Sequence, residues 1–576
     1  MGHPDFGQPL HLKGPSSSKR VFSAALLGLI FLTGAFLQYH RSIWLETKQQ
    51  VGTSLCTQPS PPAEKSRYSS AYDTAEFKRT SAERLSGAVK VPTMSFDDMG
   101  PPREDERWAP FIEMHQYLED TFPLVHGRME RTAVGGYSLV YTLQGSHSNL
   151  KPLLLTGHLD VVPALTALER WTFPPFEGKI DGGWVYGRGS ADCKNNVIGI
   201  LSAMEHLLQE GWTPERTILF AFGQDEEISG PRGAVSIAKF LEDKYGHYGI
   251  SMIVDEGGMG LNNVYGAEFA LPGIAEKGYV NAVITVEMAG GHSSIPSRHT
   301  SIGILSKIIS AIEDSEVFHP NINAESPIWG YLSCVAEHGE KNLVPAWIRK
   351  AVSSPSPDFG SVAANFAATS LDNRYLIQTS KAATVIYGGL KVNALAETAT
   401  VNFNSRIDIF SSREKPPSLS FTKIGCLSNP IVSEVSRIYV ELAKPIAEKY
   451  SLHLEGEAYS KEPSIGNITF EWDDPHDPSP ISPARAGNVA WDVFSKAVQA
   501  SFGHDVITAP SAMTGNTDTR HYWNLTRNIY RWSPSRVGTR LNIHTVDEKI
   551  KIDTHIDAIR FYTELMLIAD QTLEEF

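Results

Sequence analysis

The sequence is poor in cysteine, since its 576 residues include only four, at positions 56, 193, 334 and 426. They are widely spaced, so they form neither a C-x-x-C metal motif nor a disulfide framework. A basic excess is also absent: the formal net charge is −14, which argues against nucleic-acid partners. Any metal ion must therefore be held by histidine and carboxylate side chains, and the length predicts about two to four folded units.

One long uncharged run lies near the N-terminus. Val21 to Tyr39 contains no charged residue and follows a short basic segment. As a helix it would span roughly 28 Å, close to the thickness of a membrane's hydrocarbon core. We expect a single transmembrane anchor over 21–39, a cytosolic tail over 1–20 and a lumenal body, in which the sequons at Asn467 and Asn524 are predicted to be glycosylated. A cleaved signal peptide is the alternative.

Beyond this run the chain divides by composition. Residues 40–104 are rich in serine, proline and charge, which indicates a stalk. Between 105 and 279, apolar strands alternate with helical periodicity, as is typical of an α/β domain whose mixed sheet is flanked by helices. Residues 280–425 change to a strand-helix-strand pattern with alternating polarity, and predict a smaller inserted α+β domain. The first domain is expected to resume over 426–576.

Acidic and histidine side chains follow the predicted strands at their carboxyl ends. They are His158, Asp160, Asp192, Glu226, Glu227, Asp255 and Glu256. Taken singly, each of these motifs is more often an ordinary turn. Ligands of open α/β sheets bind at this edge, however, and so many carboxylates would repel one another without cations. Histidine with carboxylates and no thiolate favours zinc or another divalent transition metal, and the charge count favours two ions that share a carboxylate.

The order and spacing of six segments resemble one enzyme family. The segments are GHLDVVP, GRGSADCKN, GQDEEISG, VDEGG, GGHSS and LNIHTVDE, within residues 105–570. They are similar to the dizinc exopeptidases and amidohydrolases that include carboxypeptidase S, glutamate carboxypeptidase, aminoacylase and succinyl-diaminopimelate desuccinylase. The resemblance is strongest to the fungal carboxypeptidase S (Gly-X carboxypeptidase) branch, through EKGYVNAVITVEMAGGHSSIPSRHTSIGIL and GNTDTRHYWNLTRNIYRW. It implies a zinc-exopeptidase-like fold in which the smaller domain is a lid or dimerisation domain.

This resemblance implies two Zn²⁺ per subunit and five metal ligands. The ligands are His158, Asp192, Glu227, Asp255 and His544. Asp192 would bridge the ions, with His158 and Asp255 on one, Glu227 and His544 on the other, and a shared hydroxide. Members of the family use either acid of VDEGG, so Glu256 is the alternative to Asp255. The family pattern also implies a cis peptide bond after the bridging aspartate, between Asp192 and Cys193.

Other residues are predicted to act around the metals. Asp160, two residues after His158, is placed to accept the second imidazole N–H and orient the ring. Glu226, next to a ligand, is predicted to be the general base that passes a proton to the leaving amine. By resemblance, His292 stabilises the oxyanion, reaching into the partner subunit's site in a homodimer formed through 280–425.

Three residues are candidates for holding the free carboxylate of the substrate. They are Asn393, Arg406 and Arg520. An arginine fork suits a planar carboxylate because two parallel hydrogen bonds can form.

These assignments predict a zinc metallocarboxypeptidase that removes the C-terminal residue of short Gly-X peptides through a dizinc-bound hydroxide. The expected location is the vacuole, with the active domain in the lumen. An N-acyl-amino-acid amidohydrolase would use the same site, because both substrates carry an amide next to a free carboxylate. A membrane-tethered binding protein without activity is the third reading, and the complete set of ligands and base argues against it.

Overall fold

The computed structural model describes residues 56–62, 66–410 and 430–576, which belong to one compact unit, Cys56–Phe576. The predicted anchor over 21–39, the cytosolic tail and Cys426 lie outside the described residues. Within the described part of the chain, no helix is both long and apolar enough to cross a membrane.

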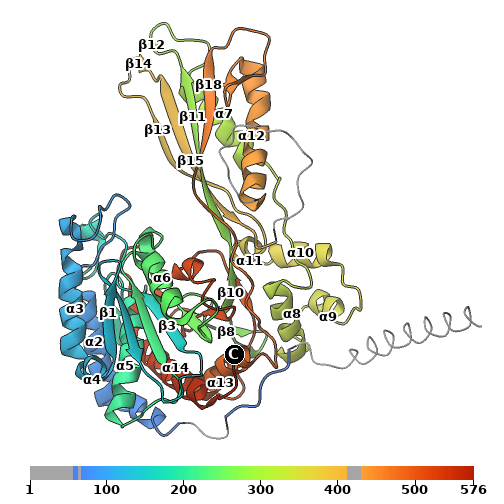
Figure 1. Ribbon diagram of the computed structural model, residues 1–576. Coiled ribbons are helices and arrows are strands. Elements are labelled where there is room, and N and C mark those ends of the chain that lie inside the picture. The colour runs from blue at the N-terminus through green and yellow to red at the C-terminus, as the bar shows by residue number, and fades with distance from the viewer. Residues whose placement is uncertain (1–55, 63–65, 411–429) are drawn as a thin grey trace, which may run out of the picture. The chain divides into compact units, whose positions relative to one another are not determined.

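Helices and strands alternate along the described chain (Figure 1). The α-helices are α2 (Ala75–Val89), α3 (Ala109–Thr121), α4 (Pro123–Arg128), α5 (Lys194–Gln209), α6 (Gly233–Tyr245), α7 (Ser301–Glu313), α8 (Pro327–His338), α9 (Ala346–Val352), α10 (Phe359–Ala367), α11 (Leu371–Leu376), α12 (Pro430–Tyr450), α13 (Val489–Phe502) and α14 (Ile552–Gln571). Short 3-10 turns are η1 (Ser69–Asp73), η2 (Glu106–Trp108), η3 (Leu168–Arg170), η4 (Glu226–Ile228) and η5 (Asp518–His521).

The strands form five sheets among the described residues. The first strands are β1 (Glu130–Val134), β2 (Ser138–Leu143), β3 (Leu153–His158), β4 (Ile180–Asp181), β5 (Trp184–Tyr186), β6 (Ile218–Gly223), β7 (Met252–Asp255), β8 (Leu261–Val264), β9 (Ala267–Ala270), β10 (Gly273–Glu276), β11 (Gly278–Met288) and β12 (Gly291–His292). The later strands are β13 (Ala382–Gly388), β14 (Ala394–Leu395), β15 (Thr398–Ile407), β16 (His453–Leu454), β17 (Glu457–Ala458), β18 (Gly466–His476), β19 (Ile507–Thr508), β20 (Ser511–Met513), β21 (Ile529–Arg531), β22 (Arg540–Leu541) and β23 (Lys549–Lys551).

An eight-stranded sheet is the centre of what we call the larger domain. Its strand order is β1-β2-β6-β3-β7-β21-β10-β20. The neighbours β6, β3, β7 and β21 are parallel, whereas β1 and β2 are antiparallel additions, so the predicted mixed α/β sheet is confirmed. Parallel strands end at the same edge, and this edge carries the polar residues that the sequence placed at strand ends.

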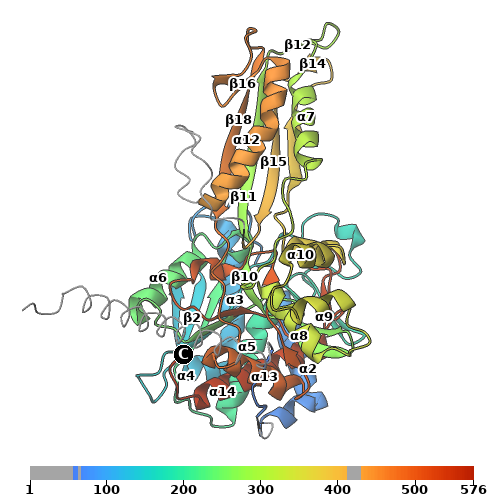
Figure 2. The ribbon, with the colours of Figure 1, turned by 90° about the vertical axis from the view of Figure 1, so that its right-hand side faces the viewer.

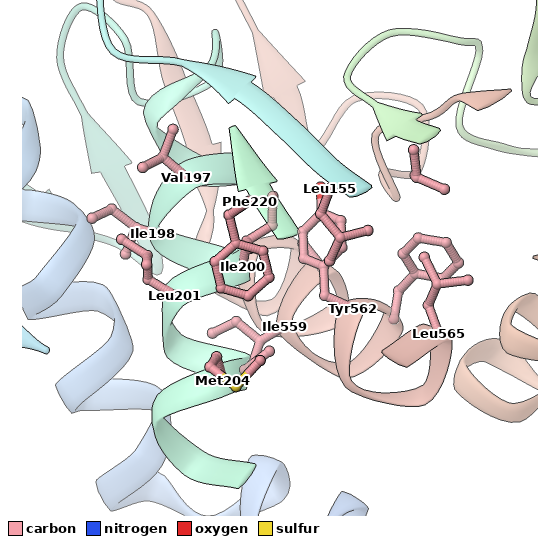
Figure 3. Packing of buried hydrophobic residues seen from close by; sticks show 14 of the residues in the cluster. Leu155, Val197, Ile198, Ile200, Leu201, Met204, Phe220, Ile559, Tyr562 and Leu565 are labelled. Carbon is pink, nitrogen blue, oxygen red and sulfur yellow. The ribbon is translucent and has the colours of Figure 1, made fainter. Parts of the chain in front are cut away.

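Helices cover this sheet with apolar side chains. α5 and α14 pack together against it, and Figure 3 shows Leu155 of β3, Ile200 of α5 and Tyr562 of α14 within one buried cluster. Burial of each large apolar side chain contributes roughly 1.5–3 kcal/mol, so this cluster holds the strand ends in fixed positions.

A six-stranded sheet forms the smaller domain, with the order β13-β15-β11-β18-β16-β17. Alternate residues of β11 and β15 are buried, and α7 and α12 cover the buried face (Figure 2). β13 is exposed along its whole length and is an edge strand. The sheet of the smaller domain therefore has one face exposed to solvent, as the alternating sequence pattern predicts.

The domain limits differ from those expected from the sequence. The smaller domain continues past residue 425, because α12 and β18 belong to it. By contrast, the helices α8–α11 lie within 280–425 but share a buried cluster with β9 and β20 of the larger domain. The sequence offered no interpretation of that helical segment.

The expected stalk, residues 40–104, packs against the larger domain in its described parts, 56–62 and 66–104. α2 packs against α5 and α14, and the hydroxyl of Tyr72 lies 2.6 Å from that of Thr563. Cys56 forms a disulfide with Cys334 of α8, with Cα atoms 4.9 Å apart. The cysteine spacing did not suggest this bond, because 278 residues separate its partners.

Candidate metal centre

Two groups of side chains meet at the carboxyl edge of the larger sheet, and Asp192 belongs to both. Nε2 of His158 lies 3.3 Å from Asp192 Oδ1 and 3.0 Å from Glu256 Oε1. On the other side, Nε2 of His544 lies 3.3 Å from Asp192 Oδ2 and 3.1 Å from Glu227 Oε2. The structure thus brings one carboxylate between two pairs of ligating groups.

Each member is positioned by the end of an element. His158 ends β3, Asp192 precedes α5, and Glu227 lies in η4 directly after β6. Glu256 follows β7, and His544 lies between β22 and β23 with a φ of 60°. The parallel strands β3, β6 and β7 bring His158, Glu227 and Glu256 together. Asp192 comes from the segment before α5, and His544 comes from the C-terminal part of the chain.

The structure corrects the choice between the two acids of VDEGG. Glu256 lies beside His158, whereas Asp255, which we expected to be the ligand, is in neither group. Successive side chains at a strand end point to opposite sides, so only one of the pair can face His158. The geometry favours Glu256.

Asp160 connects His158 to the segment that carries the predicted base. Its Oδ1 lies 3.3 Å from His158 Nδ1, and the Ser95 hydroxyl donates to Oδ2 at 2.6 Å. The backbone N–H groups of Glu226 and Glu227 each donate to this carboxylate at 3.1 Å. His158 Nδ1 also lies 3.0 Å from the backbone carbonyl of Asp160. Asp160 can therefore hold the imidazole through its main chain and fix η4 through its carboxylate, and the orienting role of the carboxylate stays a prediction.

Glu548 is a buried support that the sequence analysis missed. Its carboxylate accepts the backbone N–H of Ala191 at 2.9 Å and that of Asp192 at 3.1 Å, and it pairs with Arg188. The peptide bond between Asp192 and Cys193 is cis, as the resemblance implies. The acid in LNIHTVDE was visible in the sequence, but nothing there linked it to the Asp192 segment.

Cys193 is buried beside the centre, and its sulfur belongs to the same group of candidate ligand atoms as His158, Asp192 and Glu256. The backbone N–H of His158 donates to its sulfur at 3.3 Å, and burial raises the pKa of the thiol well above its usual range. The geometry is consistent with a small packed residue at this position.

The charges of the centre need compensation. Burial, with the negative charge of Asp192, raises the pKa of Glu256 to about 8. Hydrogen bonds with Asp192 and Glu227 raise the pKa of His544 to about 10. Burial also raises the pKa of Glu226 well above its ordinary value, with Glu256 adding to the shift. Each of these shifts favours the protonated form in the absence of cations, and divalent ions placed between the groups would supply compensating positive charge.

The donor set fits such ions. Within each group, the described residues offer imidazole nitrogens and carboxylate oxygens, with the Cys193 sulfur in the group around His158, and these atoms lie within 4.8 Å of one another. Oε1 of Glu227 is buried and has no hydrogen-bond partner among the described residues. An orphaned buried carboxylate oxygen is costly unless a cation or donor reaches it.

A polar cavity of about 740 Å³ opens beside the centre. Glu226, Glu227 and His544 line it together with Arg406 and Arg520. The Arg406 guanidinium lies over the Tyr279 ring at 4.5 Å and donates to Asn516 at 2.8 Å, while Arg520 pairs with Asp474 at 3.3 Å. Two of the three predicted carboxylate-binding residues are thus in one cavity with the acidic groups.

His292 and Asn393 lie together, away from this cavity's lining. They belong to the short strands β12 and β14 and their connecting turns, and the backbone N–H of Ser293 donates to the Asn393 carbonyl at 3.1 Å. His292 is exposed, with Nδ1 2.8 Å from the Ser294 hydroxyl. The structure does not bring this pair to the centre of its own chain.

The two predicted glycosylation sites differ in their surroundings. Asn524 is exposed, whereas Asn467 lies in β18 with a buried Oδ1. Both residues belong to described parts of the chain, and their modification stays a prediction.

Comparisons with known proteins identify relatives over most of the chain. Residues 154–568 match the profile described as Peptidase family M20/M25/M40. Carboxypeptidase S of Saccharomyces cerevisiae is 37% identical over 528 residues, covering 88% of both chains. An uncharacterized carboxypeptidase of Schizosaccharomyces pombe is 36% identical, covering 86% of this chain and 80% of its own. An N-fatty-acyl-amino acid synthase/hydrolase of Bos taurus is 30% identical, over 85% of this chain and 87% of its own.

The fold is also similar to solved structures. Human carnosine dipeptidase 1 superposes with a TM-score of 0.60 at 14% identity, covering 89% of this chain and all of the other. An M20 family metallo-carboxypeptidase of Sulfolobus solfataricus superposes with a TM-score of 0.56 at 17% identity, covering 85% and 99%. At these identities the likeness concerns the fold.

Proposed function

This chain belongs to peptidase family M20/M25/M40, and from that premise we propose that it is a metallocarboxypeptidase that hydrolyses the C-terminal peptide bond of short peptides of the Gly-X type. The name of its yeast relative, Carboxypeptidase S, supports this activity. The observation that carries the proposal is the polar cavity of about 740 Å³ that the acidic groups share with Arg406 and Arg520. A short substrate with an amide at one end of that cavity and a free carboxylate at the other matches both sets of groups.

The resident cofactor is two divalent cations, with zinc as the metal that the ligand types favour. His158 and Glu256 would hold one ion, Glu227 and His544 the other, and Asp192 would bridge them. When bound, such ions polarise the scissile carbonyl and make a water molecule a better nucleophile at neutral pH.

Glu226 carries the proton in this proposal. It lies next to a ligand, lines the polar cavity, and its Oε2 is 3.7 Å from His158 Nε2. Its carboxylate takes the proton of the attacking water and gives it to the departing amine. The hydrogen bond from its backbone N–H to Asp160 keeps this side chain in place.

Arg406 and Arg520 bind the substrate's carboxylate. Burial lowers the pKa of Arg406, and the positive charge of Arg520 adds to this shift, so the two guanidinium groups are close enough to interact. An incoming carboxylate relieves their repulsion.

His292 and Asn393 act in the site of a second subunit. Both are exposed and remote from their own chain's cavity lining, and they lie in the domain whose edge strand β13 is open. Ile386 and Tyr387 of that strand are 58% and 66% exposed. An exposed apolar edge is a natural surface for pairing with another copy.

The body of the protein lies in a lumen, in the vacuole, behind an anchor over 21–39. The disulfide between Cys56 and Cys334 supports an oxidising compartment. Exposed Asn524 suits a glycan on that side.

An N-acyl-amino-acid amidohydrolase is the second candidate. The relative named an N-fatty-acyl-amino acid synthase/hydrolase favours it, at 30% identity. Both candidates require the same centre, so the substrate decides between them.

A substrate panel tests the proposal. Purified residues 56–576, loaded with zinc, would be given Gly-Leu, a blocked Gly-Leu amide and N-acetyl-leucine. We expect hydrolysis of Gly-Leu that a chelator abolishes and added zinc restores, and little hydrolysis of the amide, which lacks the carboxylate. Faster hydrolysis of N-acetyl-leucine than of Gly-Leu would favour the second candidate, and no metal-dependent hydrolysis of either would refute both.

A further inference from the structure

A second cavity, of about 410 Å³, lies next to the polar one. Its wall is formed mainly by the apolar side chains of Met259, Tyr375, Leu376, Ala512 and Met513. Asp372, Ser380 and Thr514 add polar groups to it. We call it the apolar cavity. Gly515 lines both cavities, so they meet at this residue.

The apolar cavity begins close to the candidate metal centre. Gly258, which lines it, is two residues after Glu256, and its backbone N–H lies 3.3 Å from the Met513 sulfur. On the polar side, Asn516 follows Gly515 and accepts a hydrogen bond from Arg406 at 2.8 Å. The loop after β20 thus runs from the apolar cavity to the carboxylate-binding arginine within a few residues.

The outer wall is preformed by the helical segment that the sequence could not explain. α11 contributes Tyr375 and Leu376, and the cluster of α8–α11 buries Leu376 against the larger domain. Lys277, at the start of the smaller domain, donates to the carbonyl of Tyr375 at 3.0 Å and to that of Gln378 at 2.5 Å. The packing of α8–α11 and the hydrogen bonds from Lys277 both fix the position of α11, so this wall can present a fixed apolar surface to a ligand.

We propose that the apolar cavity binds an apolar group on the carbonyl side of the scissile amide, either the side chain of the residue before the cut or an acyl chain. This inference rests on the proposed function. The arginines of the polar cavity take the carboxylate end of the substrate, and the acidic groups take the amide. The opposite end of the substrate must then leave the centre elsewhere, and the apolar cavity is the neighbouring space on the other side of Gly515.

The cavity is larger than glycine requires. Ligand pockets for small molecules range from about 300 to 1,000 Å³, and the apolar cavity is within this range. Burial of a leucine side chain there would favour Leu-Leu over Gly-Leu by about tenfold or more in kcat/KM. This preference would extend the substrates of the proposed function from Gly-X peptides to peptides with a larger apolar residue before the cut.

The test compares substrates that differ only on this side of the amide. Gly-Leu, Leu-Leu and Phe-Leu form one series, and acetyl-, hexanoyl- and dodecanoyl-leucine form the other. Binding of the acyl-leucines to the zinc-loaded Glu226→Gln variant is measured by calorimetry, so that affinity is available without turnover.

Two variants place a charge in the apolar wall, Met259→Asp and Tyr375→Asp. Both side chains are partly exposed, at 41% and 38%, so the variants should fold. Leu371→Asp is the matched control, because Leu371 is also in α11 and is 68% exposed but does not line the cavity.

We expect the Leu-Leu to Gly-Leu ratio of kcat/KM to be about ten or more in the wild type and in Leu371→Asp, and to fall towards one in both wall variants. Gly-Leu turnover should be unchanged in Leu371→Asp. A stronger effect of the acyl series would identify an acyl chain as the occupant. Turnover of Gly-Leu with no advantage for larger groups would overturn the cavity assignment and leave the proposed function standing. If no substrate were hydrolysed, the proposed function would fail. The cavity assignment would still be supported if hexanoyl-leucine bound more tightly than acetyl-leucine and the Tyr375→Asp substitution abolished this difference.

Discussion

The Glu548 carboxylate accepts the backbone N–H of Asp192 at 3.1 Å, although 356 residues separate the two in sequence. A residue near the C-terminus thus positions the carboxylate that faces both halves of the candidate metal centre. Glu548 and its partner Arg188 are both buried, and the Asp192 backbone that bonds to Glu548 is partly exposed.

We therefore expect Glu548→Gln to lower both stability and metal content. Breaking a buried ion pair leaves an uncompensated charge and typically costs about 3–5 kcal/mol. Denaturant unfolding would measure the loss, and elemental analysis would count zinc per subunit. Exposed Glu574→Gln is the control, and normal stability with full zinc in Glu548→Gln would contradict this role.

Glu226→Gln should keep both metals and lose nearly all turnover. Only the proton carrier changes, and general acid–base catalysis typically contributes about 10²–10⁴-fold. Steady-state kinetics on Gly-Leu, with zinc counted in the same sample, would check this. Activity within a few-fold of the wild type would remove Glu226 from the role of base.

The two acids after β7 should behave differently in metal binding. Glu256→Ala is expected to lose about one of two zinc ions, because Glu256 and not Asp255 lies next to His158. Asp255→Asn should retain both ions. The reverse pattern would restore Asp255, the acid that the sequence suggested, as the ligand.

Complementation would test whether His292 acts across a dimer. Mixed inactive Glu226→Gln and His292→Ala subunits should recover about a quarter of wild-type activity, because half of the dimers would be hybrids with one intact site. Ile386→Lys in both chains should prevent recovery by opposing pairing at the β13 edge. Mixtures that stayed inactive despite demonstrated subunit exchange would place His292 outside the partner's site.

Membrane attachment can be separated from catalysis. The full-length protein should resist carbonate extraction and lose mass on glycosidase treatment, while residues 56–576 should be recovered in soluble form with full activity. Asn524→Gln should remove a glycan more completely than Asn467→Gln, because Asn524 is the exposed site. Full-length protein that appeared in a soluble cytosolic fraction would contradict both the anchor and the lumenal location.

Much of the candidate centre could be predicted because an apolar run followed by polar residues marks the end of a buried strand in the sequence. The apolar runs that precede His158 and Glu226 identify two neighbouring parallel strands, and the sheet places their ends together. The choice between Asp255 and Glu256 could not be made in this way. It depends on which of two consecutive side chains turns towards His158, and that is a property of the backbone at the end of β7.

Contacts between residues far apart in the sequence could not be predicted either. Neither the bond between Cys56 and Cys334 nor the support of Asp192 by Glu548 leaves a local pattern, because each joins segments far apart in the chain. The expected domain boundaries differ from those in the structure for the same reason. α12 and β18 carry ordinary helix and strand signals, and only tertiary packing shows that they complete the smaller domain.

The disulfide also determines where tension would enter the folded body. A pull on the residues that precede Cys56 would pass through two sulfur atoms into α8. The hydrogen bonds between Gln58 and Thr508 would then carry little of that force. Without the bond, such a pull would peel the following segment from the surface one contact at a time. With the disulfide in place, a pulling force is transmitted through the covalent S–S bond to α8. The force therefore reaches α8 before any strand of the eight-stranded sheet.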